Sequence, residues 1–119
     1  MTAKRSARHF LQDILDSIGL VREYMEGLTR EQFEEDLFTQ DAVARRIGII
    51  AEASKHIPPE IKALRPEIPW PSIVSMRNFL THEYFAVANE SVWNVVQIHL
   101  EPLELAATAR LAALADEEV

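Results

Sequence analysis

The stretch that decides the fold is Ala7–Met25, ARHFLQDILDSIGLVREYM. Within it, apolar residues recur at alternating steps of four and three residues. Such spacing keeps one face of a helix apolar and is typical of the seam by which the helices of an antiparallel bundle pack. We expect a helix over about residues 3–26, ended by Gly27, because glycine is often found just past the last residue of a helix. The apolar positions recur at steps of four and three residues, at Ala7, Leu11, Ile14, Ile18, Val21 and Met25.

Two more helices are expected next. Thr29 is suited to cap a short helix that runs through Leu37, because its hydroxyl can accept a hydrogen bond from a free N–H group of the first turn. A longer helix is expected from about Asp41 to His56, and Pro58 closes it because the residue before a proline avoids the helical conformation. Its inner stripe holds Val43, Ile47 and Ile50, with Ala42, Ile49 and Ala53 beside them.

The second half of the chain is expected to be helical as well. Residues 60–65 have room for one or two turns, and Trp70-Pro71 opens a helix with proline in its first turn, where the missing N–H costs nothing. Asn89 is suited to cap a last helix that runs to about Ala115 and is kinked by Pro102. The inner stripe of this helix holds Trp93, Val96, Leu100, Leu103, Ala107, Leu111 and Leu114.

Composition and length agree with this interpretation. The chain has 119 residues, 48% of them hydrophobic, and only three glycines, and no segment alternates convincingly between apolar and polar residues. We therefore expect residues 1–119 to form a single all-α domain, an antiparallel bundle of four to five helices.

Several classes of protein are disfavoured. The chain has no cysteine, which rules out disulfides and thiolate metal sites and fits a cytoplasmic protein. No apolar run is long enough to span a membrane, and polar residues interrupt the start of the chain, so we expect neither a membrane span nor a secretory signal. The net charge of −7 argues against a general RNA-binding module, although an acidic chain can cleave RNA if its cations gather in one cleft.

The segment that carries chemistry is Met76–Tyr84, MRNFLTHEY. On a regular helix Asn78 and His82 are neighbours on one face, whereas Arg77 and His82 lie about 140° apart around the axis. Two routes could bring Arg77 and His82 together: a two-fold axis that pairs two copies of this helix, or a helix end or distortion near His82.

Such a cluster would support RNA cleavage without a metal ion. A histidine has an ordinary pKa near neutrality and can take a proton from a ribose 2′-OH or return one to the leaving oxygen. Arg77 would offer forked donors to the phosphoryl oxygens, and Asn78 could orient His82 or donate to the same oxygens. The default alternative is that these polar residues are solvated surface and that Tyr84 is a half-buried packing residue.

The pattern Arg77-Asn78-x3-His82-x-Tyr84 resembles the R-x4-H-x-Y signature of HepT-like toxins in the HEPN superfamily. The similarity covers about residues 8–105 and includes residues 41–53, Ile68-Pro69-Trp70 and Val92-Trp93. The chain departs from the family where Ala51 replaces a common glycine and where residues 86–89 lack a common aspartate. Neither departure touches the candidate catalytic groups.

The resemblance implies properties that composition does not. It implies a homodimeric HEPN-type bundle with Arg77 and His82 in a cleft between protomers, acting as a metal-independent endoribonuclease without a cofactor. It also implies a partner, a minimal nucleotidyltransferase antitoxin, which in some pairs transfers AMP from ATP to the tyrosine equivalent to Tyr84 and silences the toxin.

A second hypothesis is a non-catalytic subunit that binds a nucleotide or substrate for a nucleotidyltransferase complex, which the acidic charge favours slightly. A third, a dimerisation bundle without a ligand, leaves Asn78 and His82 unexplained. His82-Glu83 begins like a zinc-protease motif, but Ala86 stands where the second histidine should be, so a zinc site is rejected. Three further histidines (His9, His56 and His99) are expected at the surface or its boundary.

Overall fold

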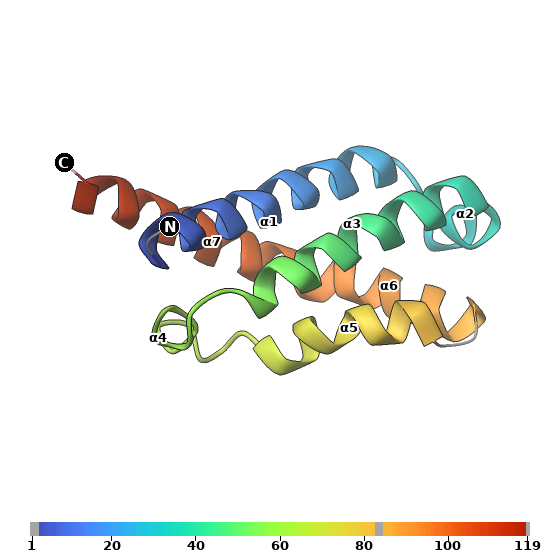
Figure 1. The fold of residues 1–119 in the computed structure, drawn as a ribbon. Helices are drawn as coiled ribbons and strands as arrows, with labels where there is room; N and C mark the ends of the chain where they lie inside the picture. The colour runs from blue at the N-terminus through green and yellow to red at the C-terminus, as the bar shows by residue number, and fades with distance from the viewer. Residues whose placement is uncertain (1–2, 83–84, 119) are drawn as a thin grey trace.

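A computed structural model describes the backbone of residues 3–82 and 85–118, and the side chains of residues 7–76 and 92–116. This part of the chain contains helices and connecting turns but no strand, which confirms the all-α prediction (Figure 1). Its helices are α1 (Ala3–Met25), α2 (Arg30–Glu35), α3 (Leu37–Lys55), α4 (Pro59–Lys62), α5 (Trp70–His82), α6 (Phe85–Ile98) and α7 (Leu100–Glu118). No helix among the described residues is long and apolar enough to cross a membrane.

The core lies where α1, α3, α5 and α7 meet. Helix α3 packs against α1 on one side and α5 on the other, and α7 packs against α1 (Figure 1). The apolar stripe predicted for the first helix is buried at every position, and so are Val43, Ile47 and Ile50 of α3. Of the stripe predicted near the end of the chain, Leu100, Leu103, Ala107 and Leu114 are buried, and Trp93, Val96 and Leu111 are half-buried.

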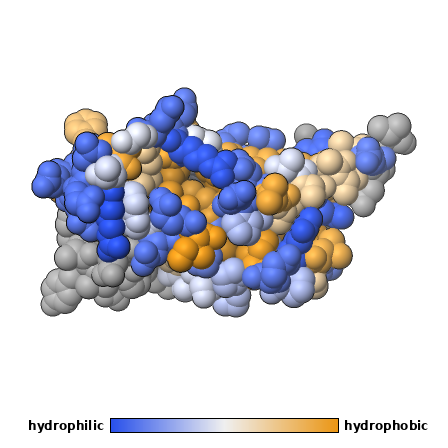
Figure 2. Space-filling view, turned by 180° about the vertical axis from the view of Figure 1, so that it is seen from behind, coloured by the Kyte–Doolittle hydropathy of each residue, from blue (hydrophilic) through white to orange (hydrophobic). Residues whose placement is uncertain are grey.

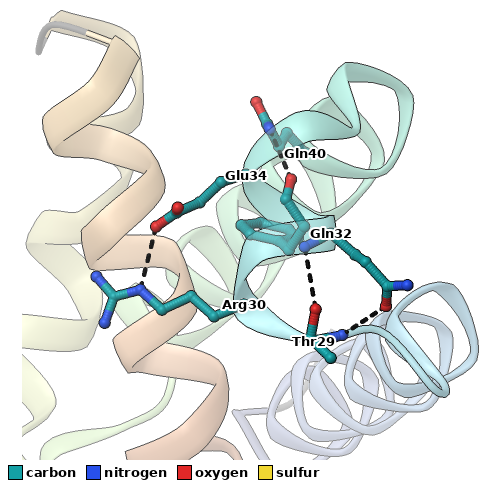
Figure 3. A network of polar contacts seen from close by, with 6 residues as sticks. Thr29, Arg30, Gln32, Glu34 and Gln40 are labelled. Atoms are coloured by element: carbon teal, nitrogen blue, oxygen red, sulfur yellow. Dashed lines mark hydrogen bonds and ion pairs between the residues drawn. The ribbon is translucent and has the colours of Figure 1, made fainter.

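The short helix α2 is capped at its start by the polar side chains of Thr29 and Gln32. The Gln32 N–H donates to the Thr29 hydroxyl at 3.1 Å, and the Thr29 N–H donates to the Gln32 side-chain oxygen at 2.9 Å (Figure 3). This reciprocal capping box confirms the cap predicted at Thr29. The predicted end at Leu37 is wrong, because α2 stops at Glu35 and Asp36 begins the next helix.

Helix α3 therefore starts four residues earlier than its apolar stripe suggested. The Asp36 carboxylate accepts from the Thr39 N–H at 3.0 Å and from the Thr39 hydroxyl at 2.7 Å, so Asp36 caps α3. The first turn of the helix carries Leu37 and Phe38, which are 62% and 89% exposed. Because these apolar side chains point away from the core, the inner stripe of α3 does not mark its true start.

The last predicted helix is two helices. Helix α6 begins at Phe85, so Asn89 lies inside a helix and is not its cap. Proline at 102 has no N–H to bond the carbonyl of Ile98, and its ring crowds that carbonyl. The chain breaks at His99 and restarts at Leu100, which places Pro102 in the first turn of α7. The predicted kink is an interruption at His99, three residues before the proline. Helical hydrogen bonds continue on both sides of it, from the His99 N–H to the Val95 carbonyl and from the Leu103 N–H to the His99 carbonyl.

The cap at Asp36 makes the stability of the fold depend on pH. Hydrogen bonds from the Thr39 side chain and backbone lower the pKa of the Asp36 carboxyl below its ordinary value. Because the pKa is lower in the folded state than in the unfolded one, this contribution is present above the unfolded pKa and lost as the pH falls through the folded pKa. We expect Asp36→Asn, which keeps a capping oxygen without the charge, to unfold at lower temperature than wild type at neutral pH. In strong acid, thermal unfolding followed by circular dichroism should give equal midpoints; a difference that persists there would contradict this origin.

Candidate active site

Helix α5 carries most of the candidate motif. It runs without interruption from Trp70 to His82, so positions 77, 78 and 82 belong to one helix, and His82 is the last residue of this helix that the structure describes. Positions 78 and 82 are one turn apart on one face, while positions 77 and 82 are separated by about 140°. The side chains of Arg77, Asn78 and His82 lie outside the described part, and Tyr84 lies outside the described residues. Their roles in catalysis and modification remain predictions.

The first half of α5 is held firmly in the bundle. The Trp70 indole N–H donates to the carbonyl oxygens of Lys62 and Arg65, both at 3.2 Å, so the start of α5 is tied to the end of α4. One turn on, Ile73 is 2% exposed in the core. Met76, the residue before the motif, is half-buried and packs against the core. The motif thus continues a helix whose rotation about its axis is fixed by packing.

The anchoring role of Trp70 was not predicted from the sequence, which indicated only a helix start and a family resemblance at this residue. The residue is 9% exposed, and the ammonium of Lys62 lies 6.0 Å from its ring centre. Partial burial beside this ring lowers the pKa of Lys62. The signal that could have revealed the anchor is a tryptophan directly before a helix-opening proline, since a buried indole N–H requires an acceptor.

Helix α2 lies beside the start of α3, at the end of the bundle where α5 ends and α6 begins (Figure 1). Phe33 of α2 is fully buried, and its ring centre lies 5.7 Å from that of Trp93 in α6. The buried amide of Gln40 in α3 donates to the Phe33 carbonyl at 2.7 Å. One aromatic residue therefore connects three helices at this end of the molecule.

The outer face of α2 is polar. Arg30 and Glu34 form an ion pair at 3.1 Å, one turn apart and both exposed (Figure 3). An exposed pair of this kind stabilises a helix only slightly. The contribution of α2 to the fold therefore comes from the apolar contacts of Phe33 beneath it.

The other histidines with described side chains lie on other elements. His9 and His56 are exposed; His56 stacks on Phe10 with ring centres 4.7 Å apart and lies 3.4 Å from Glu52. This contact places Glu52 of α3 beside the exposed histidine that follows the last residue of the helix. Among the residues that the structure describes, no group of three or more His, Cys, Asp or Glu side chains could hold a metal ion.

Comparison with known proteins identifies the class to which this helical bundle belongs. The profile described as ribonuclease HepT-like matches residues 14–109, which include α5 and the whole motif. The chain belongs to the HepT-like ribonuclease family of the HEPN superfamily, as its motif predicted.

Three related proteins illustrate this similarity. The "Probable ribonuclease HepT" of Thermococcus cleftensis is 42% identical over 101 residues, which cover 85% of this chain and 92% of that protein. A "Putative RNase" of Methanocaldococcus jannaschii is 33% identical over 93 residues, covering 78% and 77% of the two chains. A "Gamma-glutamylcyclotransferase and putative RNase" of the same organism is 38% identical over 101 residues, which cover 85% of this chain and 46% of that protein. No solved structure gives a significant match.

Proposed function

We propose that this protein is a metal-independent endoribonuclease and the toxin of a toxin–antitoxin pair. The observation that carries the proposal is the pattern Arg77-x4-His82-x-Tyr84 at the end of α5, inside a segment that matches the HepT-like family. Relatives named as ribonucleases support the same activity. The anchored first half of α5 supports it as well, because a catalytic group must be held by a rigid element.

In the proposed mechanism a phosphoryl group of the RNA is transferred from the 5′ oxygen of one nucleotide to the 2′ oxygen of the nucleotide before it. His82 removes the proton from a ribose 2′-OH, and the freed oxygen attacks the adjacent phosphorus. The bond from phosphorus to the 5′ oxygen of the next nucleotide breaks, and that oxygen takes up a proton, which leaves a 2′,3′-cyclic phosphate. Arg77 stabilises the charge that builds on the phosphoryl oxygens, and Asn78 orients His82 or adds a donor.

The proposed active form is a homodimer. Since α5 is helical as far as His82, Arg77 and His82 of one chain are separated around the helix axis rather than adjacent. A two-fold axis near the end of α5 would bring Arg77 of one copy close to His82 of the other, and would supply a second histidine as the proton donor.

The proposed control is a minimal nucleotidyltransferase antitoxin. It would transfer AMP from ATP to the Tyr84 hydroxyl with release of pyrophosphate. Tyr84 is two residues from His82 in the sequence, so the added phosphate would lie near the groups meant for the RNA phosphate. An anion of this size beside Arg77 would exclude RNA by charge and by volume.

The direct test is cleavage of a defined RNA by the purified, unmodified protein. We expect the rate to be unchanged by EDTA and the new 5′ fragments to end in a 2′,3′-cyclic phosphate, because the proton transfers and charge stabilisation come from side chains. Loss of activity in EDTA that returns with a divalent cation would contradict the mechanism. Absence of cleavage by a folded protein that binds ATP or a nucleotidyltransferase would instead favour the binding-subunit hypothesis.

The intact mass of the protein distinguishes control by AMP transfer to Tyr84 from control by binding of the partner alone. Purification with the partner enzyme and ATP is expected to add one or more AMP groups at Tyr84 and to abolish cleavage. An unchanged mass together with inhibition by the partner would show control by binding, and would overturn the modification proposed for Tyr84.

A further inference from the structure

A pocket of about 300 Å³ opens at the surface between α7, α1 and the segment that leads from α4 into α5. Its inner wall is formed by Leu11, Trp70 and Ala106, which are buried. The space exists because α7 presents small side chains to it, at Ala106, Ala109 and Ala113. Seen from behind, the molecule shows apolar residues at its surface between strongly hydrophilic ones (Figure 2). A pocket of this size can hold a small molecule.

One arginine lies at the mouth of this pocket on a fixed backbone. The Arg65 N–H donates to the Lys62 carbonyl at 3.0 Å, and the Arg65 carbonyl accepts from the Trp70 indole at 3.2 Å. The side chain of Arg65 is exposed, whereas Arg110, the other charged residue of the described lining, is half-buried and has contacts of its own. No described residue of the lining is acidic, although the chain carries 19 acidic and 12 basic residues. The pocket therefore favours a ligand with a negative charge at its outer end.

The rest of the lining decides what kind of anion fits. Apart from the two arginines, the Trp70 indole N–H is the only hydrogen-bonding side-chain group of the described lining, and it already donates to two backbone carbonyls. Sugar hydroxyls, nucleobase edges and peptide amides would lose hydrogen bonds to water here without replacement, which costs free energy. A hydrocarbon body would instead be stabilised by burial, and it would also cover Leu64, which lines the pocket and is 62% exposed.

We propose that the pocket binds a small amphiphilic acid. The carboxylate accepts hydrogen bonds from the Arg65 guanidinium at the mouth, and the hydrocarbon chain lies against Trp70 and the alanines of α7. The pocket lies beside the start of α5, whereas the candidate motif lies at the end of that helix. Binding here is therefore separate from the proposed active site and does not rest on the proposed ribonuclease function.

Octanoate is the probe that tests this site. Isothermal titration calorimetry of the whole protein is expected to show saturable binding of octanoate, and the melting temperature should rise with octanoate concentration because the ligand binds the folded state. 1-Octanol has a comparable hydrocarbon chain without the charge and should bind about tenfold or more weakly, because it lacks hydrogen bonds between two charged groups. Absence of saturable octanoate binding, or equal binding of 1-octanol, would overturn the proposal.

Three single substitutions locate the ligand. Arg65→Gln should weaken octanoate binding by about tenfold and leave 1-octanol binding unchanged, because it removes only the charge at the mouth. Arg45→Gln, at an exposed position of α3, is the matched control and should leave both affinities unchanged. Ala109→Leu, also at an exposed position, fills the pocket and should abolish binding of both ligands.

Circular dichroism must show that each variant is folded. If Ala109→Leu does not fold, the octanoate affinity of Arg65→Gln decides the result. An octanoate affinity that is unchanged by Arg65→Gln, or by a folded Ala109→Leu, would place the ligand elsewhere and contradict the site.

Discussion

Replacing His82 with alanine is expected to reduce RNA cleavage by about 10²- to 10⁴-fold, the usual contribution of general acid–base catalysis. The substitution removes the only proposed group that can accept and return a proton near neutral pH at the end of α5. The measurement is the single-turnover rate on a defined RNA at saturating protein, which separates chemistry from binding.

The control for this loss is His9→Ala. His9 is an exposed histidine of α1, where it lies 3.4 Å from Asp13, and its removal should leave the cleavage rate unchanged. Circular dichroism and thermal unfolding must show that His82→Ala is folded. A folded His82→Ala protein with full activity would remove His82 from the mechanism.

The largest expected effect on stability is that of Phe33→Ala, a loss of about 3–5 kcal/mol in the free energy of unfolding. Phe33 is fully buried, contacts the Trp93 ring and accepts from the Gln40 amide through its carbonyl. Truncation leaves a cavity under α2, which is too short to remain in place without this contact. Unfolding in urea, followed at equilibrium, measures the loss.

Glu31→Ala, on the exposed side of the same helix, should change stability by no more than about 0.5 kcal/mol. A loss below about 1 kcal/mol for Phe33→Ala would show that α2 adds little to the bundle. Because Phe33 lies beside α6, the cleavage rate of the folded fraction would also report whether α2 supports the motif.

The long helices could be predicted because their buried residues repeat with helical spacing. Every predicted position from Ala7 to Met25 is buried, and the capping box at Thr29 is visible in the sequence as a threonine followed three residues later by a glutamine. Errors arose where a polar cap or a proline decides a boundary. Asp36 caps α3 ahead of its apolar stripe. Pro102 interrupts the helix at His99, although the apolar stripe continues on both sides of the interruption.

The candidate site was predicted by the types and spacing of Arg77, His82 and Tyr84 together with the resemblance of the surrounding sequence. The family is confirmed, and so is the helix that carries Arg77 and His82. The acceptors that anchor this helix were not predictable, because they are two backbone carbonyls near α4 that only the fold brings to the Trp70 indole. Helical spacing within one chain also cannot specify which copy supplies each catalytic group.

The antiparallel contact between α1 and α7 has a consequence for folding during synthesis. Leu11 near the start of the chain and Ala107 near its end share one pocket wall, and Arg22 is paired with Glu104. A nascent chain that lacks α7 leaves the apolar face of α1 partly uncovered, so the native core closes only once α7 has been made. The proposed ribonuclease would therefore lack a complete core until α7 has been made.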